Sequence, residues 1–467
     1  MGSAEHTDGA GTVGAGTGLS LDELREDVAA GRIDTVLVCI TDMQGRLQGK
    51  RVHAKYFVDE VIGHGTEGCN YLMACDVDMN TVDGYEMTSW STGYGDLLMH
   101  PDFATLRRVP WQEGTAMVQC DAQWLDGTDV AASPRQILKQ QLARLADAGM
   151  TAYCGTELEF MVFLDTYEEA WLSGYRNMSP ANLYNVDYSM LGTARIEPLL
   201  RRIRLAMDGA GMIVESAKGE CNFGQHEIAF KYREALATCD DHVVYKTGAK
   251  EIAAQEDYSL TFMAKYDERE GNSCHIHLSF RGADGSMVMT SDADKEQGLS
   301  DVGRQFIAGL QAHLRELSLF FAPNINSYKR FAAGSFAPTA VKWGRDNRTC
   351  SLRLVGHGPS LRVENRVPGG DANPYLAVAA MVAAGLDGIE NKLELEPEFT
   401  GNAYQADAER VPDSLAAAVA LWRDSAWARS TFGDAAHDHY THMGEVELAA
   451  YGSAVTDWER FRGFERL

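Results

Sequence analysis

The sequence predicts an α+β protein with a small N-terminal domain that contains β-strands and a larger domain in which helices and strands alternate. Three observations support this. The chain of 467 residues is long enough for more than one core. β-rich runs at residues 34–40 and 116–120 flank a loop region rich in Gly and Asp. A helix signal at residues 133–149 is followed directly by a strand pattern at 151–164. We therefore expect a disordered tail over residues 1–19, a first domain over 20–125 and a second domain over 126–467.

The helix signal that opens the second domain has both of its ends marked. A break at residues 125–132 precedes Ser133, a typical N-cap residue, and Pro134, which suits the first helical position. Leucines then recur at helical spacing, and Gly149 suits the position just after the last turn. The strand pattern that follows contains two carboxylates, so we expect the functional residues to lie in this second domain.

Composition and charge exclude several classes of protein. Lys and Arg number 42 and Asp and Glu number 67, which gives a formal net charge of −25 at pH 7. Such an excess of acid argues against a nucleic-acid partner or an anionic membrane partner. The nine cysteines are an odd number with no Cys-x-x-Cys spacing, which favours a reducing compartment. No signal-peptide pattern or bilayer-spanning apolar run is present, so we expect a cytoplasmic location.

Two nucleotide-binding patterns occur and both fail on context. Gly9, Gly11 and Gly14 form a G-x-G-x-x-G with no preceding strand. The run from Gly45 to Arg51 resembles a P-loop, but its spacing is one residue short and Arg51 stands where Ser or Thr is needed. Any nucleotide chemistry must therefore use another scaffold.

Ionisable side chains recur at every second position in several strand-like segments, and such side chains share one face of a strand. The members are Glu157 and Glu159; His275, His277 and Ser279; and Arg362, Glu364 and Arg366. A fourth segment carries Glu215, Glu220 and Glu227. Positions 220 and 227 are separated by an odd number of residues, so in one continuous strand their side chains would point to opposite faces. We therefore expect a turn at 222–224 that brings both carboxylates to the same face.

The chemistry of this set indicates metal ions and anionic substrates. Adjacent carboxylates repel one another unless a cation lies between them. A donor set of carboxylates and a single imidazole suits Mg²⁺ or Mn²⁺ better than zinc. Neighbouring guanidinium groups suit phosphate or carboxylate. The pattern therefore favours metal-assisted phosphoryl chemistry on an open sheet or partial barrel.

At these residues the sequence resembles the glutamine synthetase family, in its type I branch, over residues 33–467. The shared motifs lie at residues 157–160, 224–228, 261–265, 271–277, 326–330, 347–348, 362–366 and 372–377. The resemblance implies an N-terminal β-grasp domain and a second domain built on a curved antiparallel sheet. It also implies a ring-shaped homo-oligomer, expected to be a dodecamer, with active sites between adjacent subunits.

The resemblance further implies that ATP phosphorylates the side-chain carboxylate of glutamate and that an amine then displaces phosphate. It assigns one Mg²⁺ or Mn²⁺ site to Glu159, Glu220 and Glu227 and the other to Glu157, His275 and Glu364. Gly271, Arg330 and Arg366 align with glutamate-binding positions, and Arg348 aligns with an arginine that steadies the transferring phosphoryl group. Glu215, His277, Ser279, Arg353 and Arg362 align with positions on the nucleotide side. Arg348, Arg330 and Glu220 are thus the implied catalytic residues.

The sequence departs from the family pattern on the side of the nucleophile. The mobile flap of the family carries a glutamate where this chain has Phe336. The ammonium-side loop is also missing, although Glu67 and Tyr184 are candidates for that region. We infer a ligase for glutamate and a primary amine, either an ethanolamine-like monoamine or a polyamine such as putrescine. The alternatives are an ordinary glutamine synthetase that uses ammonia and a non-catalytic relative that binds glutamate or nucleotide.

Overall fold

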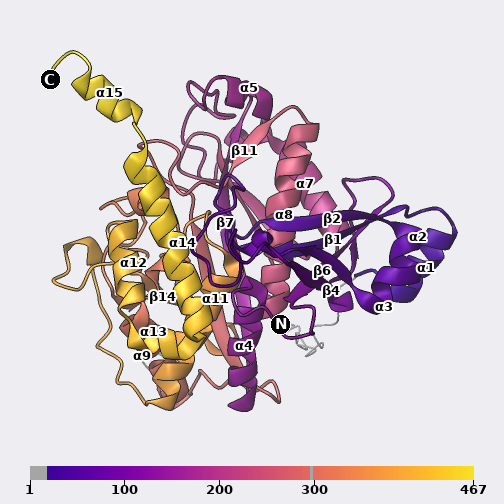
Figure 1. The fold of residues 1–467 in the computed structure, drawn as a ribbon. Coiled ribbons are helices and arrows are strands. Elements are labelled where there is room, and N and C mark those ends of the chain that lie inside the picture. The colour runs from indigo at the N-terminus through magenta and orange to yellow at the C-terminus, as the bar shows by residue number, and fades with distance from the viewer. Residues whose placement is uncertain (1–17, 295–297) are drawn as a thin grey trace, which may run out of the picture.

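The computed structural model describes residues 18–294 and 298–467, and the described chain is arranged around two β-sheets (Figure 1). Most of the predicted disordered tail, residues 1–17, lies outside the described residues. Of that segment only Gly18 and Leu19 are described, and Leu19 is buried in the core of the first sheet. The ordered first domain therefore includes Leu19, which the sequence analysis had assigned to the tail.

The first sheet has six strands in the order β2-β1-β6-β4-β3, with β5 paired to β6. The strands are β1 (Thr35–Thr41), β2 (Leu47–His53), β3 (Thr66–Cys69), β4 (Asp96–Pro101), β5 (Arg107–Arg108) and β6 (Thr115–Gln123). The short helices α1 (Leu21–Ala29), α2 (Ala54–Tyr56) and α3 (Ile62–His64) accompany them. β1 runs parallel to β6 and antiparallel to β2. The P-loop-like run forms the β1–β2 hairpin, which leads into a strand rather than a helix.

The second sheet has nine strands in the order β13-β14-β15-β12-β7-β9-β8, with β10 and β11 also paired to β7. The strands are β7 (Met150–Phe163), β8 (Val214–Gly219), β9 (Gln225–Phe230), β10 (Arg233–Glu234), β11 (Ser259–Thr261), β12 (Cys274–Gly282), β13 (Trp343–Arg345), β14 (Leu352–Val355) and β15 (Arg362–Asn365). The neighbours are antiparallel except for the parallel pair β13–β14. The long strand β7 is the centre of this sheet.

Helices cover one face of the second sheet and leave the other face open to ligands. α4 (Pro134–Asp147) and α8 (Ala235–Gln255) pack on β7, and α11 (Pro374–Glu390) packs on both of these helices and on α9 (Asp301–His313). The remaining helices are α5 (Tyr167–Leu172), α6 (Met190–Ala194), α7 (Glu197–Gly209), α10 (Ser318–Phe321), α12 (Leu415–Arg423), α13 (Ala426–Phe432), α14 (Asp434–Ser453) and α15 (Asp457–Gly463). Pro134 begins α4 as predicted, whereas the Ser133 side chain makes no capping hydrogen bond.

The alternation along β7 sends apolar and charged side chains to opposite faces. Leu158, Phe160 and Val162 are buried in the core beneath the helices. Each fully buried side chain of this size stabilises the fold by about 1.5–3 kcal/mol. Glu157 and Glu159 must then point to the opposite face, as the sequence analysis predicted. The burial of the apolar face is what holds the carboxylates on the open side.

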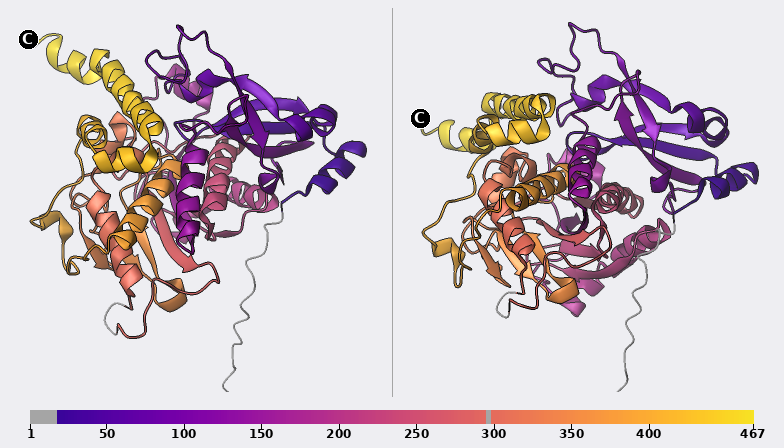
Figure 2. Two further views of the ribbon diagram at one scale, coloured as in Figure 1. Left: turned by 60° about the horizontal axis from the view of Figure 1, so that its bottom comes forward. Right: turned by 90° about the horizontal axis from the view of Figure 1, so that it is seen from below.

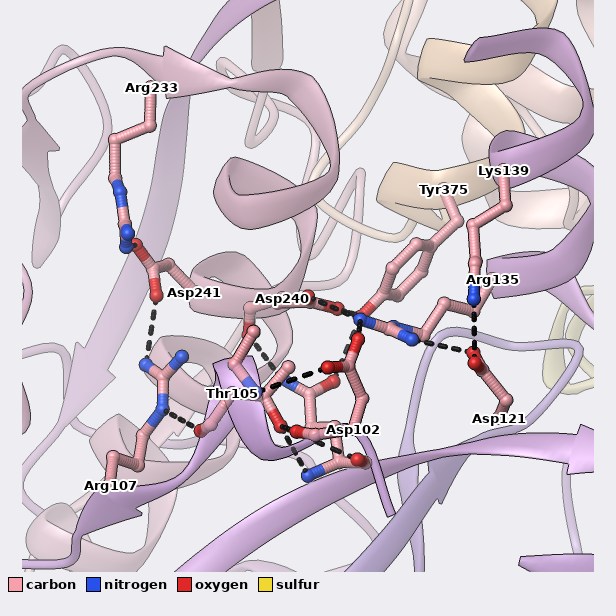
Figure 3. A network of polar contacts seen from close by, with 12 residues as sticks. Asp102, Thr105, Arg107, Asp121, Arg135, Lys139, Arg233, Asp240, Asp241 and Tyr375 are labelled. Carbon is pink, nitrogen blue, oxygen red and sulfur yellow. Dashed lines mark hydrogen bonds and ion pairs between the residues drawn. The ribbon is translucent and has the colours of Figure 1, made fainter. Parts of the chain in front are cut away.

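A buried polar network joins the two sheets' domains (Figure 3). The guanidinium of Arg135, on α4, donates to both oxygens of Asp240 at 2.9 Å, and also to Asp121 at 2.5 Å and Asp102 at 2.7 Å. The hydroxyl of Tyr375 donates to Asp240 at 2.6 Å. Asp102 and Asp121 belong to the first domain and the other three residues to the second. A guanidinium with this many carboxylate partners fixes the orientation of the first domain on the second.

Helix α14 packs against the first domain, where Nε2 of His442 donates to the carbonyl oxygen of Asp83 at 2.8 Å and the ring of His439 lies 4.5 Å from that of Tyr85. α14 crosses the front of the view in Figure 1, and α15 extends outward from its end. The two turned views in Figure 2 show the end of the chain running outward from the body of the molecule to the C-terminus. In the part of the chain that the structure describes, no helix combines the length and apolar character needed to cross a membrane.

Candidate active site

Strand register on the open face of the second sheet brings the predicted charged residues into neighbouring positions. Glu159 on β7 lies opposite Glu227 on β9, and Glu157 lies opposite His275 on β12. His277 on β12 in turn lies opposite Glu364 on β15. Residues that face each other across antiparallel strands have Cβ atoms about 4.5–5.5 Å apart. Positions separated by more than 200 residues in sequence therefore meet on one surface.

A sharp turn supplies the third carboxylate of the first cluster. β8 ends at Gly219 and β9 begins at Gln225, so Glu220 lies in the turn that the odd spacing predicted. Gly224 has a φ of +70°, and a Cβ atom there would lie 2.5 Å from the carbonyl oxygen of Val162. Only glycine fits this position without moving the backbone. The turn directs Glu220 toward Glu227 instead of away from it.

The first cluster consists of Glu159, Glu220 and Glu227, whose carboxylate oxygens lie within 4.8 Å of one another. Burial, and then repulsion from Glu220, raises the pKa of Glu159 to about 8. Burial and the neighbouring carboxylates also raise the pKa of Glu227 well above its ordinary value. Glu159 is held in place by the backbone N–H of Ser273 at 2.7 Å and by Gln225 at 3.1 Å. Carboxylates forced together in this way fit a divalent cation such as Mg²⁺ or Mn²⁺.

The second cluster brings ligand atoms of Glu157, His277 and Glu364 within 4.8 Å of one another. The family resemblance instead placed His275 in this set. His275 is also close, because its Nδ1 lies 3.3 Å from an oxygen of Glu157 and 3.5 Å from an oxygen of Glu364. Burial opposes ionisation of Glu364, but the nearby His275, Arg366 and His277 outweigh it and lower its pKa to about 2. Both histidines thus border the pair of carboxylates.

Hydrogen bonds indicate which of the two histidines has a ring nitrogen available to bind a cation. Nδ1 of His277 accepts a hydrogen bond from Arg362 at 3.2 Å, which assigns the proton of the neutral ring to Nε2. That Nε2 faces Glu157 at 3.0 Å and has no free lone pair for a metal. Burial and then Arg366 lower the pKa of His275 to about 4, so its ring is neutral near pH 7. Nδ1 of His275 faces both carboxylates, which is compatible with the ligand role that the resemblance assigned to it.

Two buried arginines beside the clusters have unused donors. Arg330 donates through Nη2 to the carbonyl oxygens of Arg366 at 3.2 Å, Val367 at 2.5 Å and Pro368 at 2.6 Å. Its Nε and Nη1 are buried and have no partner within the described residues, and Nε of Arg366 is in the same state. Buried donors without partners are costly unless a ligand satisfies them. A carboxylate substrate would do so through paired N–H···O bonds.

Gly271 allows the Arg330 side chain to reach this position. A Cβ atom at Gly271 would lie 2.1 Å from the carbonyl oxygen of Ala264 and 2.9 Å from Cγ of Arg330. Any larger residue would push the arginine stem or the backbone aside. Gly271 therefore shapes the space around a predicted glutamate-binding guanidinium, in agreement with the position that the resemblance gave it.

A cavity of about 450 Å³ opens next to the second cluster. Glu215, His277, Ser279 and Arg362, which the resemblance places on the nucleotide side, all line it. The remaining member of that set, Arg353, does not line it. Arg353 instead pairs with Glu364 at 2.9 Å and with Asp346. A space of this size is typical of a small-molecule site.

Sequence reasoning missed three side chains that line the same cavity: Tyr153, Tyr232 and Arg281. The Arg281 guanidinium lies 4.4 Å from the ring centroid of Tyr153 and donates to the hydroxyl of Tyr232 at 3.0 Å. Flat aromatic and guanidinium surfaces suit stacking with a planar base. Tyr153 and Arg281 continue the alternation that runs through Glu157 and Ser279, so extending that pattern would have found them. Tyr232 follows the end of β9 and carries no such signal.

The structure does not bring the other predicted residues into these clusters. Glu67 lies on β3 of the first sheet, where its backbone carbonyl accepts a hydrogen bond from Lys50 at 2.5 Å. Tyr184 is half exposed on the segment between α5 and α6, and Arg348 is exposed on the turn between β13 and β14. Phe336 has a φ of +57° and an exposed side chain, and its carbonyl oxygen accepts a hydrogen bond from Arg366 at 3.3 Å. The roles assigned to these four side chains remain predictions.

The fold and the site define a class of protein in which two clusters of cation-binding carboxylates and a ligand cavity lie on the same open face of an antiparallel sheet. Residues 131–462 match the family described as glutamine synthetase, catalytic domain. The chain therefore belongs to the glutamine synthetase family. All nine cysteines are free, and seven of them are buried: Cys39, Cys75, Cys120, Cys154, Cys239, Cys274 and Cys350.

Comparisons with individual proteins agree with this assignment. The chain is 65% identical over 449 residues to gamma-glutamylethanolamide synthetase GlnA4 of Streptomyces coelicolor, covering 96% of each protein. It is 38% identical over 445 residues to glutamate–isopropylamine ligase of a Pseudomonas species, covering 94% of this chain and 97% of that protein. The solved GmaS/ADP complex superposes with a TM-score of 0.82 at 29% identity over 95% of this chain and 99% of its own. The predicted α+β, glutamine synthetase-like fold is confirmed.

Proposed function

We propose that this chain is an ATP-dependent ligase that joins the γ-carboxylate of glutamate to a small primary monoamine such as ethanolamine. The observation that carries the proposal is the pair of cation clusters beside a cavity, in a chain 65% identical to a gamma-glutamylethanolamide synthetase. Isopropylamine, the substrate named for the second relative, is likewise a small monoamine with an uncharged tail. Ethanolamine-like amines are therefore favoured over polyamines.

The proposed reaction has two steps. An oxygen of the glutamate γ-carboxylate takes the terminal phosphoryl group of ATP, which releases ADP. The amine nitrogen then attacks the carbonyl carbon of the γ-glutamyl phosphate, a C–N bond forms, and phosphate leaves with the electron pair of the C–O bond while the nitrogen loses a proton. Divalent cations, when bound, neutralise the charge of the phosphate oxygens.

The residues of this chain bind and orient the two anions. The unused donors of Arg330 and Arg366 are suited to hold the glutamate carboxylates. The cavity lined by Tyr153, Tyr232 and Arg281 is suited to hold the base of the nucleotide, and the GmaS structure was solved with ADP. His277 and Arg362 lie where the cavity meets the second cluster, between base and cations. This arrangement brings two negative groups together without requiring a covalent enzyme intermediate.

The exposed Phe336 supports an amine over ammonium. A carboxylate at this point of the flap would attract ammonium and accept its proton, and a phenyl ring does neither. The aromatic side chain instead offers apolar surface to the tail of a larger amine. A ring-shaped homo-oligomer and the use of Mg²⁺ or Mn²⁺ complete the proposal.

The test is ATP-dependent phosphate release with Mg²⁺ and glutamate, across ethanolamine, isopropylamine, ammonium, putrescine and spermidine, with mass spectrometry of each product. We expect kcat/KM for ethanolamine to exceed that for ammonium by at least about tenfold, a difference of about 1.4 kcal/mol in transition-state stabilisation. Turnover chiefly with ammonium would make the chain an ordinary glutamine synthetase. Turnover chiefly with putrescine would make it a polyamine ligase, and no turnover would favour a non-catalytic relative.

A further inference from the structure

The turn between β8 and β9 carries two buried amide side chains, Asn222 and Gln225. The side-chain oxygen of Gln225 accepts a hydrogen bond from the backbone N–H of Asn222 at 2.9 Å, and this bond assigns the –NH₂ group to the other side of the amide. A buried –NH₂ group needs acceptors, so its neighbours show what the side chain holds in place. The same turn also carries Glu220 of the first cation cluster.

One acceptor of the Gln225 amide is a predicted cation ligand. Nε2 of Gln225 donates to Oε2 of Glu159 at 3.1 Å, and the backbone N–H of Ser273 donates to the same oxygen at 2.7 Å. Within the described residues no donor contacts the other oxygen, Oε1. A carboxylate that is held through one oxygen keeps the lone pairs of the other for a cation. Gln225 therefore orients Glu159 for the first cluster.

The same –NH₂ group also contacts the loop of residues 267–272, which precedes β12. Nε2 of Gln225 lies 2.9 Å from the carbonyl oxygen of Gly271 and 3.0 Å from Oδ1 of the fully buried Asn272. Gly271 is one of the predicted glutamate-binding residues. Two N–H groups thus serve three acceptors, one on the cation ligand Glu159 and two on the loop. The position of the amide depends on both sides together.

Asn222 attaches the turn to the same loop at two further points. Its Nδ2 donates to Oδ1 of Asp267 at 3.0 Å and to the carbonyl oxygen of Glu270 at 2.7 Å. Neither partner belongs to a cation cluster. Asn222 therefore holds the loop alone, whereas Gln225 holds both the loop and a cation ligand. This difference allows an experiment to separate the two effects.

We propose that Gln225 is a positioning residue that links cation binding at the first cluster to glutamate binding at the loop of residues 267–272. The inference deepens the proposed function, on which it rests for the identity of glutamate. A cation bound by Glu159 restrains that carboxylate, and with it the Gln225 amide and the carbonyl group of Gly271. Because this ordering is complete before glutamate arrives, glutamate binds more tightly. The link is reciprocal, so glutamate strengthens cation binding by the same factor.

Calorimetric titration with Mg²⁺ and with glutamate, each with and without the other at saturation, tests this proposal. In wild type, Mg²⁺ should lower the Kd of glutamate at least about fivefold, and glutamate should lower the Kd of Mg²⁺ by the same factor. Gln225→Met keeps the length of the side chain and removes its donors. It should raise the Kd of Mg²⁺ about tenfold and abolish the coupling. Asn222→Leu should raise the Kd of glutamate and leave that of Mg²⁺, measured without glutamate, within about twofold of wild type.

Gln141→Met is the matched control, because Gln141 is equally buried on α4 but donates to the carbonyl oxygen of Thr431 at 3.3 Å. It should leave both Kd values and their coupling unchanged.

Contrary outcomes separate this inference from the proposed function. If Mg²⁺ and glutamate bind wild type independently, or if Gln225→Met keeps the wild-type coupling, the link is wrong and the ligase function stands. If wild type binds Mg²⁺ but no glutamate, with or without ADP, the proposed function fails and the link fails with it. If a thermal unfolding scan shows that Gln225→Met does not fold, Asn222→Leu decides. An unchanged Kd of glutamate in that variant overturns the role of the turn.

Discussion

Replacing Glu364 by Gln tests how much the negative charge of this buried carboxylate contributes to the stability of the fold. The Glu364 side chain is 1% exposed and pairs with Arg353 at 2.9 Å and with Arg366. Its pKa is lowered from 4.5 to about 2. A lowering of the pKa by this much corresponds to roughly 3 kcal/mol of stability. Because the group is buried, solvent screening does not reduce this figure substantially.

The sign of the pH dependence follows from the direction of that shift. A carboxylate with a lowered folded-state pKa contributes its full stabilisation above the unfolded pKa of 4.5 and loses it as the pH falls toward 2. At pH 7 the attraction to Arg366 is present in full, whereas the attraction to a protonated His275 is lost above the pKa of that ring, about 4. Glu364→Gln should therefore destabilise the protein at pH 7 by up to roughly 3 kcal/mol, and the loss should shrink as the pH falls toward 2.

The assay is urea unfolding of the metal-free protein at pH 7, followed by tryptophan fluorescence. Glu396→Gln is the matched control, because Glu396 pairs with Lys342 at 2.7 Å but its side chain is 55% exposed. An exposed pair of this kind contributes less than about 1 kcal/mol. If the two variants unfold at the same urea midpoint, the reasoning about Glu364 is wrong. An unchanged Mg²⁺ requirement for phosphate release in Glu364→Gln would contradict its predicted role as a ligand.

Four further outcomes are expected. Glu159→Ala should abolish phosphate release, since it deprives a cation of a ligand, and substantial residual activity would refute the metal assignment. Because the pKa of Glu159 is about 8 without metal, Mg²⁺ should bind more tightly as pH rises from 6 to 8, and calorimetry in two buffers should detect the released proton. Phe336→Glu should shift preference toward ammonium; an unchanged amine profile would show that the flap does not select the amine. Asp240→Asn removes a charge from buried Arg135 and should destabilise the protein by about 3 kcal/mol or more, measured as a fall in Tm, whereas an equal Tm would mean that the network does not hold the domains together.

Strand alternation explains why so much of the site was predictable. Side chains at i and i+2 share a face whatever the rest of the fold does. Glu157 with Glu159 and His275 with His277 could therefore be assigned to common faces before any register was known. The odd separation of Glu220 from Glu227 likewise required a turn, and the structure has one at Gly224. Local geometry was sufficient for each of these inferences.

Loop side chains are harder to place from the sequence. Tyr184 was chosen by its position in the chain and its role stays a prediction, whereas the structure shows that the same loop packs through Val186 and turns Asp187 and Tyr188 toward Lys218. The direction of a loop side chain depends on which backbone atoms the loop touches, and that contact depends on Gly219 in a distant strand. No pattern within residues 182–189 carries this information.

The sequence by itself determined the α+β class and the chemistry of a carboxylate-rich, cation-binding face, because composition and period-two alternation are local properties of the chain. The family followed from the resemblance of short motifs, which are also local. Only the tertiary structure decided which strands are neighbours, and therefore that Glu159 meets Glu227 and that His277 meets Glu364. It also decided that Nδ1 of His277 accepts a hydrogen bond from Arg362 and that Lys218 contacts Asp187 and the ring of Tyr188. Register, tautomer and loop contact depend on atoms brought together from distant parts of the chain, and such contacts form only when the whole sheet has been assembled.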